Sequence, residues 1–214
     1  TIVAPNDTYV DFGYGIDYNG DGTKLLISSS IYNFEYDGNI IDYGNTIFTY
    51  DIANVSSYII NSIAYNYNSN NNVLVIGCSN SNAKLMSGSD GINWNIILTN
   101  TIFSDNKCNS VCWNGSMWVA GGEGDYPIAY SEDVDALTWV SSSSSNLLFT
   151  SNICNMIEWN GTYFIAGGNG NIPLAYSSDG IEWMQNLDSE NIFTSNICLT
   201  LGTRKNISSN TIND

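Results

Sequence analysis

The sequence has no histidine and very few basic residues. Among its 214 residues are 5 Lys or Arg against 21 Asp or Glu, which gives a formal net charge of −16 at pH 7. Without histidine no catalytic pairing of a nucleophile with an imidazole base can form. So few cations cannot neutralise a phosphate backbone or hold to an anionic lipid surface, so neither nucleic acid nor such a membrane surface is an expected partner.

Long apolar runs and helical periodicity are also missing. No stretch of 18 apolar residues occurs, so membrane insertion is not expected. The chain begins at Thr1 without a basic and then apolar leader, so we expect it to be processed or cut from a longer protein. No segment sustains a 3.6-residue period, so helix should be minor. An apolar content of 43% still allows a sizeable core.

The five cysteines form no CxxC pair, and without histidine a zinc site is improbable. Cys108, Cys154 and Cys198 recur at matching repeat positions, whereas Cys78 and Cys112 do not. Two interpretations stay open. The thiols are either packed in the core as small hydrophobic groups, or paired as disulfides between neighbouring repeats.

Internal repeats dominate the sequence. Four units cover residues 13–60, 61–108, 109–154 and 155–198, followed by a tail at 199–214. Each unit opens on an aliphatic residue and, two residues later, an aromatic residue followed by Asn. Each closes on an aliphatic–Phe–Thr/Ser marker. The opening residues are Ile16-Asp17-Tyr18-Asn19, Ile63-Ala64-Tyr65-Asn66, Val111-Cys112-Trp113-Asn114 and Ile157-Glu158-Trp159-Asn160; the closing markers are Ile47-Phe48-Thr49, Ile102-Phe103-Ser104, Leu148-Phe149-Thr150 and Ile192-Phe193-Thr194.

Within a unit the pattern predicts four short strands. In the last unit an alternating strand precedes Asn160-Gly161, a hairpin signal whose two positions are both expected at positive φ. Further β-rich runs follow, separated by Gly167-Gly168 and by Ser177 to Gly180. Four antiparallel strands in about 46 residues match one blade of a β-propeller. We therefore predict a single all-β propeller domain or segment over 1–214, either four blades closed on themselves or a slice of a larger ring.

One turn of the unit carries a family resemblance. Ser177-Ser178-Asp179-Gly180-Ile181-Glu182-Trp183 resembles the Asp box, the bacterial-neuraminidase repeat of sialidase-like propellers, and similar units are common in proteins of large DNA viruses. The resemblance implies that Ser, Asp and Gly shape a turn on which Trp packs, away from the ligand face. The predicted structural residues are Ser87, Asp90, Gly91, Trp94, Ser131, Asp133, Trp139, Ser177, Asp179, Gly180 and Trp183.

Enzymatic activity is not expected. The resemblance implies that a sialidase needs three arginines around a carboxylate, and Arg204 in the tail is the single Arg. The alternative is a glycoside hydrolase with two carboxylates. Asp17 and Glu158 share one repeat position on first strands, which we expect to line the central channel of a propeller.

The sequence contains a candidate calcium loop and several candidate glycosylation sites. Asp17, Asn19 and Asp21 begin like a calcium loop, but its later ligands are missing, so either a plain hairpin turn or bound Ca²⁺ fits. No other cofactor is expected. Of the glycosylation sequons, Asn6, Asn54 and Asn206 are the candidates, because turn geometry accounts for Asn114 and Asn160.

The loops opposite the Asp boxes are the predicted ligand face. They are small, rich in amides and carry an aromatic residue, a composition that suits hydroxyl-rich ligands but also describes any solvated turn. We predict a non-enzymatic structural or recognition module on a cell or virion surface that binds glycan or protein, with self-assembly through blade edges as an alternative. The candidate ligand residues are Asn80, Asn82, Glu123, Asp125, Tyr126, Asn169 and Asn171.

Overall fold

The computed structural model is built from short antiparallel strands and two 3-10 helices, as the all-β prediction requires. It describes residues 59–66, 73–79, 83–89, 93–97, 102–105, 107–193 and 195–202. Four further strands, at 16–18, 24–28, 33–37 and 48–50, are described as backbone only. The 3-10 helices are η1 (Ser143–Leu147) and η2 (Leu187–Asn191), and both follow the last strand of a unit.

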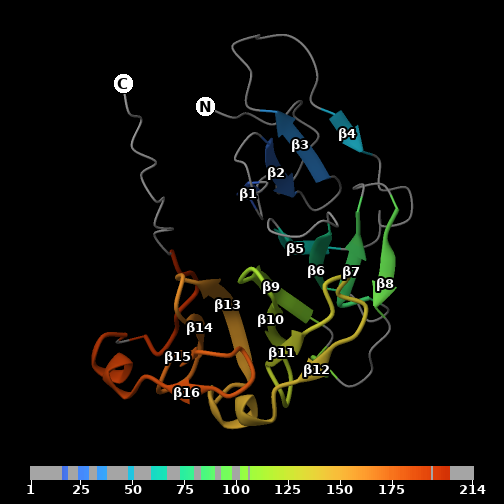
Figure 1. The fold of residues 1–214 in the computed structure, drawn as a ribbon. Helices are drawn as coiled ribbons and strands as arrows, with labels where there is room; N and C mark the ends of the chain where they lie inside the picture. Colours follow the sequence, from blue (N-terminus) through green and yellow to red (C-terminus); the bar gives the residue numbers. More distant parts are fainter. Residues whose placement is uncertain are drawn as a thin grey trace, which may run out of the picture.

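Each repeat forms a set of four strands, which we call a blade and number I to IV in chain order (Figure 1). The strands of blade I form one sheet, and bridges between blades II, III and IV join theirs into one 12-stranded sheet. Within a blade consecutive strands pair antiparallel. Blade I holds β1 (Ile16–Tyr18), β2 (Lys24–Ser28), β3 (Asn33–Asp37) and β4 (Phe48–Tyr50). Blade II holds β5 (Ile59–Tyr65), β6 (Leu74–Ser79), β7 (Leu85–Gly88) and β8 (Asn95–Ile97).

Blades III and IV repeat the same order of strands. Blade III holds β9 (Lys107–Trp113), β10 (Trp118–Glu123), β11 (Ile128–Ser131) and β12 (Val140–Ser141). Blade IV holds β13 (Ile153–Trp159), β14 (Phe164–Asn169), β15 (Leu174–Ser177) and β16 (Met184–Gln185). The first strands β9 and β13 begin two residues before the predicted unit boundaries at 109 and 155. They therefore include Cys108 and Cys154, which the sequence analysis assigned to the ends of the preceding units.

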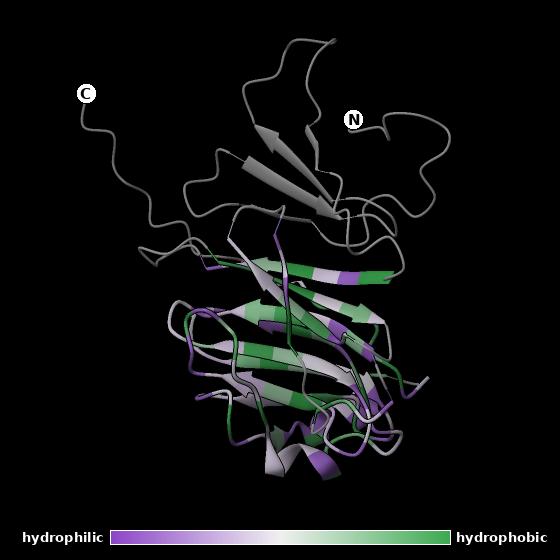
Figure 2. Cartoon of the chain, turned by 90° about the vertical axis from the view of Figure 1, so that its right-hand side faces the viewer, coloured by the Kyte–Doolittle hydropathy of each residue, from purple (hydrophilic) through white to green (hydrophobic). Residues whose placement is uncertain are grey.

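Neighbouring blades meet at one bridging residue pair each. The end of a second strand pairs with the start of the next blade's first strand, at Ser79↔Lys107 and at Glu123↔Ile153. The same bridge recurs after blade IV, at Asn169↔Ile197. Figure 2 shows the described strands in successive layers, with hydrophobic segments along the strands and hydrophilic residues mostly in the loops.

The core lies between blades, because both faces of a blade are apolar. One cluster joins β9, β10 and β11 to β13, β14 and β15, and Val119 and Phe164 are fully buried in it. A second cluster joins blades II and III around Trp118, and a third covers the other face of blade II. A blade of this size cannot bury its faces alone, so stability comes from stacking.

A β-bulge at the start of β9 and of β13 places one cysteine thiol of each strand in this core. The pairing skips Asn109 and Asn155, and the thiols just before the bulges donate to the carbonyl two residues on, Cys108 to Ser110 and Cys154 to Met156, both at 3.6 Å. All five cysteines are free and buried. The buried-thiol interpretation is therefore confirmed, and the disulfide interpretation is wrong.

Glycine is required on the second strand because the next blade's thiol lies directly against it. A Cβ on Gly121 would lie 2.6 Å from Cys154 Sγ, and one on Gly167 would lie 2.6 Å from Cys198 Sγ. A Cβ on Gly77 would lie 2.8 Å from Cys108 Sγ. The recurring Gly and Cys are therefore one inter-blade contact.

The Ser177–Trp183 turn has the predicted structural role. The Ser177 hydroxyl accepts from Gly180 N at 2.8 Å, and Asp179 Oδ1 accepts from the N–H groups of Ile181 and Glu182, each at 2.9 Å. Gly180 has a φ of +75°, and the buried Trp183 indole donates to its carbonyl at 3.1 Å. These bonds satisfy the backbone of a tight turn.

The equivalent turn of blade III, Ser131–Trp139, is two residues longer than the Ser177–Trp183 turn. Asp133 accepts from Asp135 N at 3.0 Å and from Leu137 N at 3.2 Å, and Trp139 donates to Ala136 O at 2.8 Å. Ala136 takes the place of Gly180 and its φ is +55°. In blade II, Ser87 is buried and Trp94 packs against that blade's apolar cluster, whereas Asp90 and Gly91 lie outside the described residues.

The Asn-Gly hairpins differ from the prediction in one respect. Positive φ occurs at Gly115 and Gly161 but at neither Asn114 nor Asn160. The Asn side chain instead accepts two turn N–H groups, and for Asn160 these are Thr162 N at 2.9 Å and Tyr163 N at 2.8 Å. These positions therefore require asparagine for the hydrogen bonds that its side-chain oxygen accepts, and not for a left-handed backbone conformation.

We expect Gly121→Ala to destabilise the protein by about 1–3 kcal/mol, because the new methyl group overpacks against Cys154 Sγ. Urea unfolding followed by tryptophan fluorescence measures the change. Gly202→Ala is the matched control, since nothing lies within 4 Å of its Cβ position. Equal midpoints for the two variants would contradict the contact.

We expect Asp179→Ala to cost about 1 kcal/mol at pH 7, by analogy with a lost helix cap, and Glu182→Ala in the same turn to cost less than about 0.5 kcal/mol. Burial favours the neutral acid, but hydrogen bonds from Glu182 N, Ile181 N and the Ser177 hydroxyl outweigh it and lower the pKa of Asp179. The stabilisation is therefore present above the pKa of an unfolded aspartate and is lost as pH falls through the lower folded value. Unfolding midpoints between pH 2 and 7 test this, and an unchanged pH profile in the Asp179→Ala variant would contradict it.

We expect the native thiols to react slowly with a disulfide reagent near neutral pH. Burial raises the pKa of Cys78 to about 12 and raises that of Cys108 and Cys154 as well, so the reactive thiolate is scarce. Unfolding in guanidinium without reductant should release all five thiols of the sequence. A lower count would show a disulfide.

Candidate functional site

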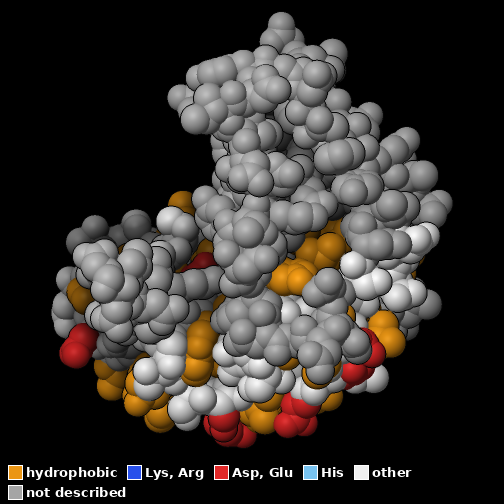
Figure 3. Space-filling model, turned by 45° about the horizontal axis from the view of Figure 1, so that its top comes forward, with side chains coloured by type: hydrophobic (Ala, Val, Ile, Leu, Met, Phe, Trp, Pro, Cys, Tyr) orange, Lys and Arg blue, Asp and Glu red, His pale blue; other side chains and the backbone are white. Residues whose placement is uncertain are grey.

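The loops opposite the Ser–Asp turns form the candidate site, which we call the loop face. It consists of the loops at 123–127 and 169–173 and of the described parts of the connections, at 142–152, 186–193 and 195–196. Figure 3 shows acidic side chains along the lower margin of the described surface and no basic side chain in that view. The described surface in this view is therefore unfavourable to anionic ligands.

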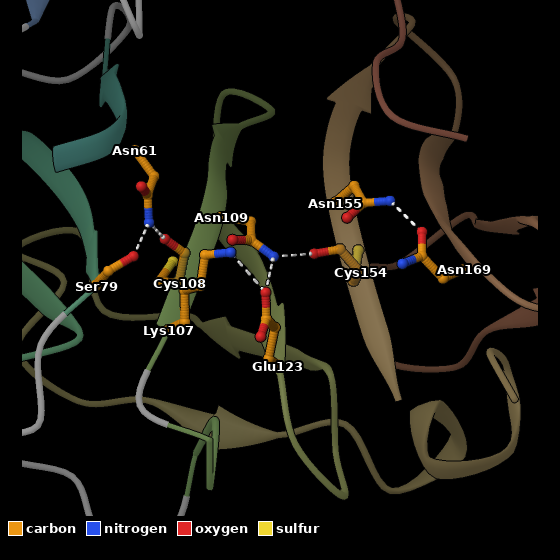
Figure 4. A network of polar contacts seen from close by, with 9 residues as sticks. All are labelled: Asn61, Ser79, Lys107, Cys108, Asn109, Glu123, Cys154, Asn155 and Asn169. Carbon is orange, nitrogen blue, oxygen red and sulfur yellow. Dashed lines mark hydrogen bonds and ion pairs between the residues drawn. The ribbon is translucent and has the colours of Figure 1, made fainter. Parts of the chain in front are cut away.

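Three asparagines fasten neighbouring blades beneath this face (Figure 4). Each occupies the bulge of a first strand, and its amide nitrogen donates twice. Asn61 donates to Ser79 Oγ at 2.7 Å and to Cys108 O in the next blade at 2.8 Å. Asn155 donates to Asn169 Oδ1 at 2.7 Å and to Cys198 O at 2.9 Å. Both amide hydrogens are thus used, one within the blade and one across the boundary.

The third asparagine, Asn109, donates to one member of the ion pair formed by Lys107 and Glu123. Asn109 donates to Cys154 O at 3.0 Å and to Glu123 Oε1 at 3.4 Å, and Lys107 Nζ lies 2.7 Å from the same oxygen. The Glu123 side chain is 22% exposed and that of Lys107 is 40% exposed. Ser79 and Asn169 hold the equivalent place of Glu123 in blades II and IV. Sequence reasoning missed this network, although an asparagine opens each of the last three predicted units.

The backbone of each loop is held by the neighbouring connection. Gly124 N donates to Asn152 O at 3.0 Å, and Gly170 N donates to Asn196 O at 2.8 Å. A Cβ on Gly124, whose φ is +133°, would lie 2.4 Å from Ser104 N, so only glycine fits there. The loops are therefore positioned by the packing of blades.

The structure divides the predicted ligand residues that it describes into a half-buried group and an exposed group. Glu123 and Asn169 are half-buried and engaged in the contacts just described. Asp125, Tyr126 and Asn171 are exposed, with Tyr126 at 39%. Asn80 and Asn82 lie outside the described residues. Asp125, Tyr126 and Asn171 are thus the described members available to a ligand.

The predicted metal and glycosylation residues remain predictions. Asp17 lies in β1, of which the backbone alone is described, and Asn19 and Asp21 lie outside the described residues, as do Asn6, Asn54 and Asn206. Within the described ranges no group of three or more His, Cys, Asp or Glu side chains could hold a metal ion.

Glu158 lies in β13, the first strand of blade IV, where it is half-buried and pairs across the strands with Ile165. Its repeat equivalent Cys112 is buried in the cluster between blades III and IV. For Asp17 the backbone alone is described, so a pair of catalytic carboxylates formed by Asp17 and Glu158 stays a prediction.

Comparison with known proteins supports the architecture. A search of curated protein sequences finds no match to this chain. Among solved structures, the extracellular domain of BT4673 from B. thetaiotaomicron, a protein assigned as a one-component system, superposes with a TM-score of 0.61 at 16% sequence identity. The match covers 92% of this chain and 25% of that one, so this chain spans a quarter of that structure's length. At this identity the likeness shows the fold alone.

No helix in the described part has the length and apolar character to cross a membrane.

The family comparison agrees with the repeated four-stranded sheets. The model of the DUF6242 beta propeller domain matches residues 88–197, just over half of the chain, and covers blades III and IV with the end of blade II. The chain therefore belongs to the DUF6242 beta propeller domain family.

Proposed function

We propose that this chain is a non-enzymatic recognition module that binds an uncharged glycan through its loop face. The observation that carries the proposal is the combination of exposed side chains with a fixed backbone. Asp125, Tyr126 and Asn171 are exposed, while the loops that bear them are hydrogen-bonded to the neighbouring connections. A site that is ordered before binding loses little entropy when a ligand arrives.

The chemistry of these side chains suits hydroxyl groups. The Asn171 amide can both donate and accept, the Asp125 carboxylate accepts, and the Tyr126 ring offers an apolar surface with a polar tip. A chain of net charge −16 disfavours anionic sugars and phosphorylated ligands. A protein segment with exposed hydroxyl or basic groups is the second candidate, because the same charge would attract it.

We place the module outside the cell or on a virion surface. Its structural neighbour is an extracellular domain, which supports the first location, whereas the second rests on the resemblance of its repeats to Asp-box units of large DNA viruses. Membership of the Asp-box propellers is part of the same proposal, and the bonds within the Ser177–Trp183 turn support it.

A panel of neutral and acidic glycans on an array tests the function. We expect binding to neutral glycans that falls at least about tenfold in Tyr126→Ala and in Asn171→Ala, which is the loss of about 1.4 kcal/mol of contact energy. Thr162→Ala is the control, since Thr162 is exposed on the opposite hairpin. Binding that is equal in all three variants, or release of sugar from the bound glycans, would contradict the proposal.

A further inference from the structure

The serine run at 141–145 fastens blade III to the outer strand of blade IV. The run begins in β12 and continues into η1. The Ser144 hydroxyl accepts from Trp183 N at 2.9 Å and donates to Ile181 O at 3.2 Å. The Ser142 hydroxyl donates to the same carbonyl at 2.7 Å. Two serine hydroxyls therefore bond a backbone N–H and a backbone C=O at the start of β16.

The backbone N–H that Ser144 binds lies on the open edge of the sheet. Among the described strands β16 pairs with β15 alone. Asn186 N donates to Leu174 O in β15 at 2.8 Å. Successive residues of a strand turn their backbone groups to opposite sides, so Trp183 N, three residues earlier, points away from β15. The serine hydroxyls therefore bond where the backbone of a further strand would bond.

The equivalent helix of blade IV uses its side chains differently. In η2 the N-cap residue Asn186 accepts from Asp188 N at 3.1 Å, within its own helix. Ser142 is the N-cap residue of η1 and makes no such bond, because its hydroxyl is directed to blade IV. Asp188 takes the place of Ser144, and an ionised carboxylate cannot donate to a carbonyl. The bonds to the edge of β16 therefore depend on the hydroxyls of η1 and not on the 3-10 helix itself.

Apolar and acidic side chains flank this edge. Met184 in β16 is 55% exposed and Leu147 at the end of η1 is 81% exposed. Gln185 Nε2 donates to Leu147 O at 3.1 Å, so this end of the helix lies beside the strand. Glu182 and Asp188 are exposed on either side of β16. Exposed apolar residues on an edge favour pairing with another chain, whereas charged residues oppose it.

We propose that the edge of β16 is a strand-docking surface for a second copy of this chain, and that the Ser142 and Ser144 hydroxyls keep it closed. A second copy fits because the same edge on two copies can pair antiparallel about a twofold axis, so that each supplies the groups that the other needs. The net charge of −16 on each copy is a further barrier, which salt screens. The proposed glycan site takes no part in this surface.

Hydrogen exchange of the Trp183 amide tests whether the hydroxyls close the edge. In dilute solution without added salt, we expect exchange at least about tenfold faster in Ser142→Ala/Ser144→Ala, because Trp183 N loses its acceptor. Ser143→Ala is the matched control, since Ser143 is exposed in the same helix and its hydroxyl bonds to no described residue. Ser144→Ala alone replaces the double variant if that variant does not fold. Unchanged exchange at Trp183 would overturn the proposal.

Sedimentation velocity tests the occupant. At about 0.5 M salt, where repulsion between copies is screened, we expect the double variant to form dimers and the unmodified chain and Ser143→Ala to remain monomers. Adding Met184→Glu to the double variant should restore the monomer, because it places a charge on the edge. A double variant that exchanges faster but stays monomeric would overturn the proposal. So would equal association of the unmodified chain, or dimers that persist with Met184→Glu.

Discussion

The structure depends on how closely one blade can approach the next. At Gly77, Gly121 and Gly167 a cysteine thiol across the boundary lies too close for a Cβ atom. Glycine is therefore required at these positions by the neighbouring cysteine and not by the conformation of its own strand. This close approach lets the facing sides of neighbouring blades share one apolar layer, between blades II and III and between blades III and IV. Blades held in this way contribute to stability mainly through their neighbours.

The same approach organises the polar groups. A bulge in the first strands of blades II, III and IV frees an asparagine to reach across the boundary, and a backbone carbonyl on the far side accepts one of its hydrogens. Because the loop backbones also bond to the connections beside them, the geometry of the loop face follows from blade packing. A change that loosens a boundary between blades would therefore also move Asp125, Tyr126 and Asn171, the residues of the proposed ligand site.

Much of this could be predicted from the sequence, because repetition reports on structure directly. The order of strands, the turns around Asp133 and Asp179 and the burial of their tryptophans follow from spacing and turn chemistry. The direction of single side chains does not. Glu158 alternates correctly along its strand, yet whether that side faces an axis or a neighbouring blade depends on how sheets stack. The bulge at Asn155 was not predicted either, because it places the buried residues Cys154 and Ile157 three positions apart, a spacing that strict alternation along a strand does not predict.

The double donation by the bulge asparagines has a consequence for the chemical ageing of the protein. Asn61 and Asn109 are each followed by serine, and a small following residue lets the backbone nitrogen attack the side-chain amide and release ammonia. The aspartate formed would have no hydrogens to give to Ser79 or Cys108, or to Glu123 and Cys154. At Asn109 it would also place a second carboxylate beside Glu123, with Lys107 as the nearest cation. The bonds that join the blades thus also protect these amides, since an asparagine held by two hydrogen bonds seldom reaches the geometry of that reaction.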